Sequence, residues 1–142
     1  MNQVSARNQI SGTVSEVETG TAMSVVTISA NGQQIVSAIT NQAAQELGLK
    51  KNDSVIALVK AKEAILLKGD AGSMKVSARN RFKGRVTEIS KGPAMASVTL
   101  DAGQLKLTAA ITRQAIDDLQ LAQGDQVTAL FKATEVILQK AA

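Results

Sequence analysis

One five-residue stretch, "VSARN", occurs twice in this chain without a single difference, at residues 4–8 and again at residues 76–80. Alternate side chains of a strand share a face, so we expect Ser5 and Arg7 to point the same way, and likewise in the second copy. A hydroxyl beside a guanidinium, which offers several N–H donors in a rigid fork, makes a small anion clamp. The plainer interpretation is a strand start that carries one surface salt bridge.

A second repeated feature is a lysine at the end of an apolar strand. Lys60 follows "VIALV" and Lys132 follows "VTALF", and an alanine comes next in both places. Such a lysine can simply extend to water. Placed over a shared pocket, it becomes a second cation, and the backbone N–H of Ala61 or Ala133 becomes a further donor.

The third feature is a threonine before each expected helix, at Thr40 and Thr112. The beginning of a helix exposes free N–H groups and a partial positive charge, and it therefore binds oxyanions readily. A plain capping role is compatible with this function. Together, the repeated residues supply hydroxyls, cations and backbone donors, which can hold a tetrahedral oxyanion.

The composition excludes most catalysis. The chain has no cysteine and no histidine, so disulfides, thiolate sites and the commonest general base are absent, and we expect no zinc, haem or iron–sulfur cofactor. The repeated acids, at positions 53 and 125 and at 63 and 135, stand beside turns and are typical of turn and cap residues. We therefore predict a binding protein, with no enzymatic activity and no bare metal cation.

A nucleic-acid-binding module of the OB type is the alternative function, since a net charge of +4 and a pI of about 9.6 allow it. Phe82 and Phe131 are the two aromatic residues, too few for base stacking, and no cluster of Lys and Arg stands out. A salt-sensitive gel shift would decide. No helix-turn-helix or ATP-binding glycine loop is recognisable, so the chain would not regulate or transport unaided.

The apolar segments predict a protein of the cytoplasm. None approaches the roughly 20 residues that cross a bilayer. The first residues, "MNQVSARNQIS", contain no apolar signal-peptide core.

The whole chain is a tandem repeat. A shift of 72 residues aligns it with itself without a gap, from Val4 against Val76 to Lys68 against Lys140, and nearly half of the aligned pairs are identical. We expect one module over residues 1–70 and a second over 74–142, joined by the flexible linker "GDAGSMK".

Each module is expected to contain five strands, with one short helix before the fourth. Asn-Gly at 31–32 predicts a hairpin, and residues 101–103 predict the matching turn. A helix is predicted over 40–49, ended by Gly48, and a tight turn at 60–62 joins the last two strands. This pattern indicates a mainly β protein built of two tandem OB-fold-like five-stranded barrels.

These residues resemble a known family. "SARN" at each module start, Gly12 and Gly84, "AIT" before the helix and "KA" between the last strands are similar to the Mop family, or molbindins, whose module is also called TOBE-type. The resemblance implies binding of molybdate or tungstate in the cytoplasm, for storage, buffering or delivery. It also implies strand exchange between modules, oxyanion sites between them, and a homotrimer.

The resemblance also implies two kinds of site. One would be lined by Ser5, Ala6, Arg7, Thr40, Lys60 and Ala61, and its counterpart by Ser77, Ala78, Arg79, Thr112, Lys132 and Ala133. A second kind, near the threefold axis, would use two loops that contain Gly20, Thr21, Ala22, Gly92, Pro93 and Ala94. These loops read "GTAMSVV" and "GPAMASV" where the family carries a "GAVNAEV"-like stretch with an Asn, which leaves backbone N–H groups as donors. On this interpretation, "VSARN" is kept twice because each copy faces an anion pocket.

Overall fold

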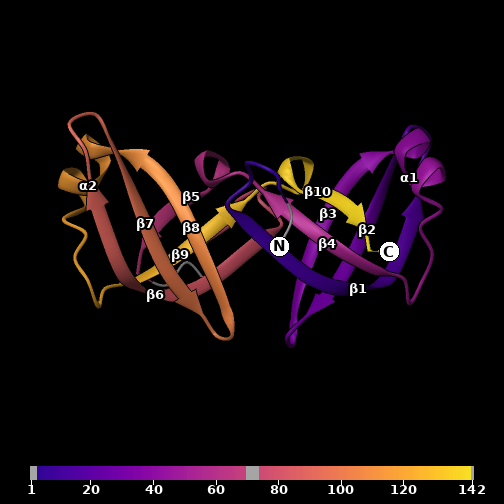
Figure 1. Ribbon diagram of the computed structural model, residues 1–142, viewed down its shortest axis with the longest axis horizontal. Coiled ribbons are helices and arrows are strands. Elements are labelled where there is room, and N and C mark those ends of the chain that lie inside the picture. Colours follow the sequence, from indigo (N-terminus) through magenta and orange to yellow (C-terminus); the bar gives the residue numbers. More distant parts are fainter. Residues whose placement is uncertain (1–2, 70–73, 142) are drawn as a thin grey trace.

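The computed structural model describes residues 3–69 and 74–141 of the chain (Figure 1). Part of the predicted linker, residues 70–73, lies outside the described residues. The first repeat contains β1 (Asn8–Thr19), β2 (Met23–Ala30), β3 (Gln33–Thr40), α1 (Asn41–Leu47), β4 (Ser54–Val59), the 3-10 turn η1 (Ala61–Glu63) and β5 (Ile65–Lys68). The second contains β6 (Asn80–Lys91), β7 (Met95–Ala102), β8 (Leu105–Thr112), α2 (Arg113–Leu119), β9 (Gln126–Phe131), η2 (Ala133–Glu135) and β10 (Ile137–Lys140).

The strands form two curled antiparallel sheets of five strands, and each sheet borrows its fifth strand from the other repeat. The strand orders are β10-β4-β1-β2-β3 and β5-β9-β6-β7-β8. The predicted fold class, mainly β with two OB-like five-stranded units and one short helix in each, is confirmed. The module boundaries at 1–70 and 74–142 remain a prediction that rests on the sequence repeat, since the exchanged strands cross between the two sheets.

The long first strand of each repeat is bent and pairs with two neighbouring strands. A register shift between Val14 and Glu16 marks a bulge in β1, and β6 has the same shift. Gly12 lies where the curled sheet leaves no room for a side chain, because an added Cβ would be 2.7 Å from the carbonyl oxygen of Ser29. Gly84 is as crowded, 2.5 Å from the carbonyl oxygen of Asp101. Tight curling therefore explains why both glycines are kept.

The predicted hairpin at Asn31-Gly32 is confirmed, and both residues have the positive φ that such a turn requires, 50° and 80°. The second hairpin differs from the prediction of a turn at 101–103. Asp101 and Ala102 extend β7, and the turn falls at residues 103–104. Ala102 is fully buried, so keeping it in the ladder is more favourable than leaving it in a surface turn.

Both predicted helices form and are capped as expected. The hydroxyl oxygen of Thr40 accepts a hydrogen bond from the Ala43 N–H at 3.1 Å, and Thr112 does the same for Ala115. Gly48 ends α1 with a left-handed φ of 60°, whereas Gln120 adopts that conformation at the end of α2. Each helix has seven residues, so its stability depends on packing at the sheet's end.

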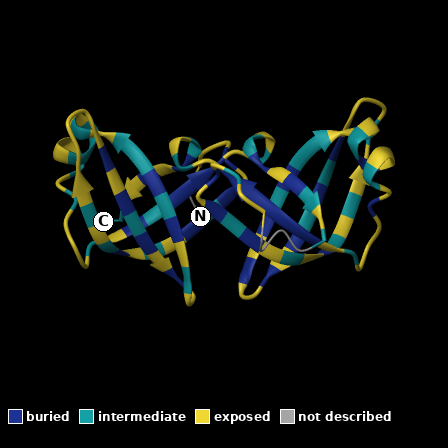
Figure 2. Cartoon of the chain, turned by 180° about the vertical axis from the view of Figure 1, so that it is seen from behind, coloured by how far each residue is buried: buried dark blue, intermediate teal, exposed yellow. Residues whose placement is uncertain are grey.

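The core runs through both sheets and is continuous where they meet (Figure 2). At this junction, the second half contains Phe82 and Phe131, whose ring centroids are 5.9 Å apart. The equivalent positions of the first half hold the smaller Ile10 and Val59. The two repeats therefore fill the same interface with different side chains, as expected where volume matters more than identity.

A lysine at the end of each exchanged strand fastens it to the other repeat. Lys140 Nζ lies 3.4 Å from a carboxylate oxygen of Asp53 and donates to the Gly48 carbonyl, at the end of α1, at 3.2 Å. The N–H of Lys50 donates to Asp53 at 2.9 Å. This backbone hydrogen bond is the main cause that lowers the pKa of Asp53, and the charges of Lys140 and Lys50 add to it.

We expect this cluster to make stability depend on acidic pH. Because folding lowers the pKa of Asp53, its carboxylate stabilises the fold above the ordinary value of 3.8 and loses that effect as the pH falls through the lower folded pKa. Urea unfolding of the wild type and of Asp53→Asn from about pH 6 to about pH 2 should show a stability difference that shrinks towards acid. In Lys140→Gln, part of the pH dependence should remain, since the Lys50 hydrogen bond is kept. A wild-type advantage that is constant with pH would contradict this assignment.

Within the described residues, no helix is both long and apolar enough to cross a bilayer.

Candidate functional site

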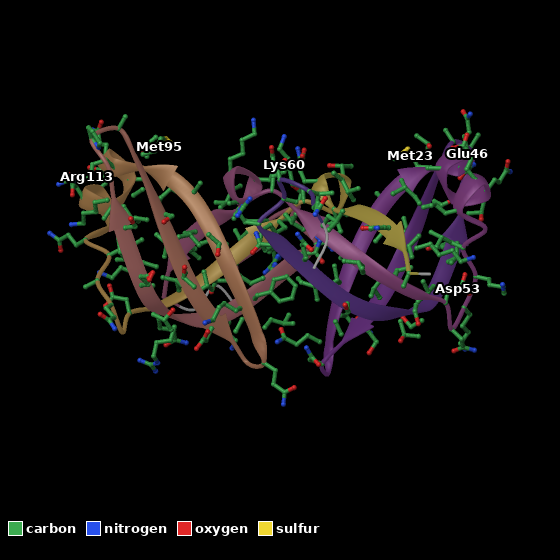
Figure 3. The ribbon with its side chains drawn as sticks, viewed as in Figure 1. Met23, Glu46, Asp53, Lys60, Met95 and Arg113 are labelled. Atoms are coloured by element: carbon green, nitrogen blue, oxygen red, sulfur yellow. The ribbon has the colours of Figure 1, made fainter. Side chains whose placement is uncertain are left out.

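The register of β1 against β4 brings two of the repeated motifs together. Asn8 pairs with Val59 as the outermost pair of this ladder, so Arg7 and Lys60 are the next residues beyond the same end. Lys60 lies near the middle of the molecule, between the two sheets (Figure 3). Lys60 is exposed and begins the η1 turn, in which Ala61 is the first residue. The Ser-Ala-Arg segment and the Lys-Ala turn of one repeat therefore meet at one place.

The second repeat reproduces this arrangement. Asn80 pairs with Phe131, which puts Arg79 and Lys132 beyond the same end of the β6–β9 ladder. Ala133 begins η2 after Lys132. The two junctions are therefore built alike from the repeated residues.

The Ser-Ala-Arg segments are not in the strands, contrary to the prediction from the sequence. Each strand begins only at the asparagine that follows the arginine. Ser5 and Arg7 precede β1, and their side chains are exposed. Arg7 Nε donates to the Ser5 carbonyl at 3.4 Å. In the second copy, Arg79 donates to the carbonyls of Ser77 at 3.3 Å and Val76 at 3.0 Å. The guanidinium groups therefore curl over their own segment, and most of the five N–H donors of each arginine stay available.

The alanines between them are buried, Ala6 with 7% and Ala78 with 6% of its surface exposed. A small side chain there lets the backbone approach the underlying strands closely. The alanine is thus a packing residue whose backbone groups lie next to the exposed serine and arginine.

An open groove of about 590 Å³ runs beside Arg7. Its walls contain two cations, two neutral polar side chains and three apolar ones: Arg7, Lys106, Gln9, Ser11, Val4, Ala6 and Ile56. Lys106 comes from β8, in the other repeat, and the residue at the equivalent position of the first repeat is Gln34. The groove is therefore a positively charged surface shared by both halves, and it contains no carboxylate among these lining residues.

Neither capping threonine lines the groove beside Arg7: Thr112 lines a pocket with Pro93 and Ala94, and Thr40 lines another. Thr40 pairs with Met23 at the end of the β2–β3 ladder, and Met23 lies towards the outer end of the first sheet (Figure 3). Thr40 lines a mostly apolar groove with Thr134 and Ile137 of the second repeat. Within one chain, Thr40 is thus beside the η2 turn of the other repeat and does not share the groove of Arg7.

The two loops predicted for the second kind of site are the hairpin connections at the outer ends of the sheets. In the first, the Gly20 N–H donates to the Met23 carbonyl at 2.8 Å and the Asn41 N–H to the Ala22 carbonyl at 2.9 Å. The side chain of Asn41 also donates to the Gly20 carbonyl at 3.0 Å. Thr21 and Ala22 are exposed. This loop is held by its own backbone and by one asparagine.

In the second loop, Arg113 takes the place of Asn41. Its Nη1 donates to the Gly92 carbonyl at 3.3 Å, and its Nε lies 3.9 Å from a carboxylate oxygen of Asp117. Pro93 and Ala94 share a shallow pocket with this arginine. The two loops are therefore alike in backbone and different in charge.

The interpretation that the sequence lacks a basic cluster overlooked β6. Arg81, Lys83 and Arg85 alternate along it with more buried residues and share its outward face. Arg81 donates to the Met74 carbonyl at 2.6 Å, and Arg85 donates to the Gly124 carbonyl at 2.8 Å. These two arginines bind neighbouring backbone segments to the strand, which gives them a structural role.

Two features of the junction between the repeats escaped the sequence reasoning. The last residue of "VSARN" is buried in both copies, Asn8 with 2% and Asn80 with 1% exposed, and so it cannot face a solvent-filled pocket. Its identity in both repeats was the signal. Lys106 reaches the groove from a strand far away in the sequence, and no local pattern marks it. Among the described residues, no group of three or more His, Cys, Asp or Glu could hold a metal ion.

Comparison with known proteins agrees with this architecture. The family model described as "TOBE domain" matches twice, at residues 4–66 and 76–138. The "Molybdenum transport protein ModE" of Herbaspirillum seropedicae is 39% identical over 138 residues, which are 96% of this chain and 51% of that protein. The "Molybdenum-pterin-binding protein MopA" of Rhodobacter capsulatus is 39% identical over 139 residues, 96% of this chain and 52% of that protein. The chain thus spans about half the length of these curated relatives.

A solved structure covers both halves. That protein, described as the "cytoplasmic molybdate-binding protein ModG" with molybdate bound, superimposes with a TM-score of 0.94 at 33% identity, over 99% of this chain and 100% of that one. The agreement extends over both sheets and therefore includes their arrangement. By these matches over both repeats, the chain belongs to the TOBE domain family and carries its module twice, in the tandem form of Mop-type proteins.

Proposed function

We propose that this protein binds molybdate or tungstate in the cytoplasm and serves to store, buffer or deliver the oxyanion, without catalysing a reaction. The proposal rests on one observation above all: the Ser-Ala-Arg segment and the Lys-Ala turn meet at the end of a strand ladder in both halves. The relatives named for molybdate and molybdenum support the choice of ligand.

The chemistry of the donors suits a fully ionised tetrahedral oxyanion. The predicted ligands are serine and threonine hydroxyls, the two arginines, the two lysines, and the backbone N–H groups of Ala6, Ala61, Ala78 and Ala133. A site made of donors leaves the proton of hydrogen phosphate without an acceptor, and a buried unpaired proton is costly. Sulfate is smaller and also unprotonated at neutral pH, so the size of the site must exclude it.

A second protein surface is needed to close the site. Of the residues assigned to this site, Ala6 and Arg7 line the groove, while Ser5, Lys60 and Ala61 do not. The groove has a volume of about 590 Å³, in the range of about 300–1,000 Å³ that encloses drug-sized ligands. A tetrahedral oxyanion is far smaller. We therefore propose that another copy of the chain covers the groove and that Thr40 or Thr112 reaches the site from a neighbouring subunit.

Exposed apolar side chains support such an oligomer, which we propose to be a homotrimer. Ile65 and Ile137 are 55% and 52% exposed, and Met23 and Met95 are 40% and 49% exposed. These two pairs occupy equivalent positions of the two repeats. Met23 and Ile137 also line one groove, and apolar side chains that are exposed together support a surface that another protein covers.

Calorimetric titration with sodium molybdate tests the function, with sulfate and phosphate as competitors. We expect tight binding that excess sulfate does not displace. Light scattering of the same samples should give three chains per particle. Absence of any heat with molybdate or tungstate, together with no binding by equilibrium dialysis, would refute the proposed ligand. More than two anions per chain would show that the loops at 20–24 and 92–96 also bind.

A further inference from the structure

The asparagine of "VSARN" joins three backbone segments through one buried side chain. The amide nitrogen of Asn8 donates to the carbonyl of Val59 at 3.2 Å and to that of Thr108 at 2.9 Å. Its amide oxygen accepts from the N–H of Thr108 at 2.7 Å. Asn8 therefore bonds β4 of its own repeat and β8 of the other one.

The second copy repeats this contact with the roles of the halves exchanged. Asn80 accepts from the N–H of Val36 at 2.7 Å and donates to the Val36 carbonyl at 2.8 Å. Val36 and Thr108 are equivalent positions of β3 and β8. Each asparagine thus binds the edge of the opposite sheet in the manner of an extra strand residue, and the two contacts bridge the two halves.

The position of this side chain links it to the residues proposed to bind the anion. Asn8 follows Arg7 directly, and Val59 directly precedes Lys60. The ladder of β1 and β4 ends at this pair, so its hydrogen bonds do not extend to the residues beyond. The asparagine amide is therefore the contact with the opposite half that lies next to both segments proposed to bind the anion.

On the basis of the proposed function, we propose that Asn8 and Asn80 are positioning residues of the oxyanion sites. Each holds its Ser-Ala-Arg segment against the opposite half, and Asn8 also bonds the residue that precedes the Lys-Ala turn. The distance between segment and turn sets the size of the site and so its discrimination between molybdate and the smaller sulfate. Residues that orient ligands in this way typically change affinity by about 10- to 100-fold when removed from metal sites.

The test compares Asn8→Ala and Asn80→Ala with Ser37→Ala. Ser37 is an equally buried residue of the same junction, and its hydroxyl donates to the Val136 carbonyl at 2.7 Å. The equivalent residue of the second repeat is Ala109, so alanine is tolerated in that environment. Ser37→Ala therefore removes a buried hydrogen bond between the halves without releasing a Ser-Ala-Arg segment.

Calorimetry should measure the dissociation constants of molybdate and sulfate for every variant, well below its unfolding temperature. In both asparagine variants, we expect the molybdate constant to rise by about tenfold or more and the sulfate constant to change little, so that the selectivity ratio falls. Ser37→Ala should keep the wild-type ratio. An unchanged ratio in the folded asparagine variants would overturn the proposal and reduce Asn8 and Asn80 to structural residues.

Two further outcomes keep this inference separate from the proposed function. If the wild type binds no molybdate, the proposed function fails and takes the inference with it. If the wild type binds and the alanine variants do not fold, Asn8→Thr retains one donor and one acceptor in a smaller side chain. The same selectivity ratio measured on Asn8→Thr then decides.

Discussion

Replacing Arg7 and Arg79 together by alanine is expected to weaken molybdate binding roughly 10- to 150-fold at each site. The estimate follows from the contribution of about 1.5–3 kcal/mol that a hydrogen bond to a charged group makes. Each guanidinium is exposed and most of its donors are available, so it can present two parallel N–H groups to a dianion. Calorimetric titration at fixed ionic strength measures the loss.

The matched control for this double variant is Arg85→Thr. It removes one positive charge, as each of the two substitutions does, from the outward face of β6, and the first repeat carries a threonine at this position, Thr13. We expect its molybdate affinity to stay close to that of the wild type. Replacing Arg7 and Arg79 by lysine should cause an intermediate loss of molybdate affinity, because lysine keeps the positive charge and lacks the planar set of N–H donors of the guanidinium. Binding that is unchanged in the alanine variant would refute the assignment of both arginines.

Removing β10 is expected to destabilise the first repeat more than the second, although β10 belongs to the second repeat in the sequence. A chain that ends at Val136 lacks Leu138, which is buried and pairs with Ala57 of β4. Deleting a buried leucine side chain alone costs about 2–5 kcal/mol, and the unpaired edge of β4 adds to this loss. Hydrogen exchange followed by mass spectrometry should show lost protection in β4 and β1, with β9 largely retained.

A chain that ends at Lys140 serves as the control, since it keeps β10 and the contact of Lys140 with Asp53. Its protection pattern should match that of the full chain except near Ser54, whose carbonyl accepts from the Ala141 N–H at 2.9 Å. Loss of protection in β9 rather than β4 would mean that the exchanged strands return to their own repeats in solution.

Local chemistry explains which parts of the fold could be predicted from the sequence. Thr40 and Gly48 bound the helix because a hydroxyl cap and a left-handed residue act within one turn of the chain. The Asn31-Gly32 turn is equally local. The shift of the second turn depends on the burial of Ala102, which the hairpin sequence does not reveal.

The parts that escaped prediction depend on contacts between distant segments. The residues alone did not reveal that β5 and β10 change places, which only the family resemblance implied. The repeated asparagine was assigned to the anion pocket together with its neighbours, because identity in two copies signals a constraint without saying which one. Its actual partners, Thr108 and Val36, belong to the opposite repeat. Lys106 was missed for the same reason, since it comes from the other repeat to line the same groove as Arg7.

The exchange of the last strands also determines when this protein can fold. Ala57 of β4 cannot form its strand pair until Leu138 of β10, about 80 residues later in the chain, has been synthesised. On a ribosome that adds about 5–20 residues per second, the first sheet keeps an open edge for roughly 4–16 seconds. β5 has already been synthesised by then, but its pairing strand β9 is missing for nearly as long. The nascent first half is therefore an incomplete sheet with exposed edges, a state open to aggregation, and both sheets are completed only after β9 and β10 have been synthesised.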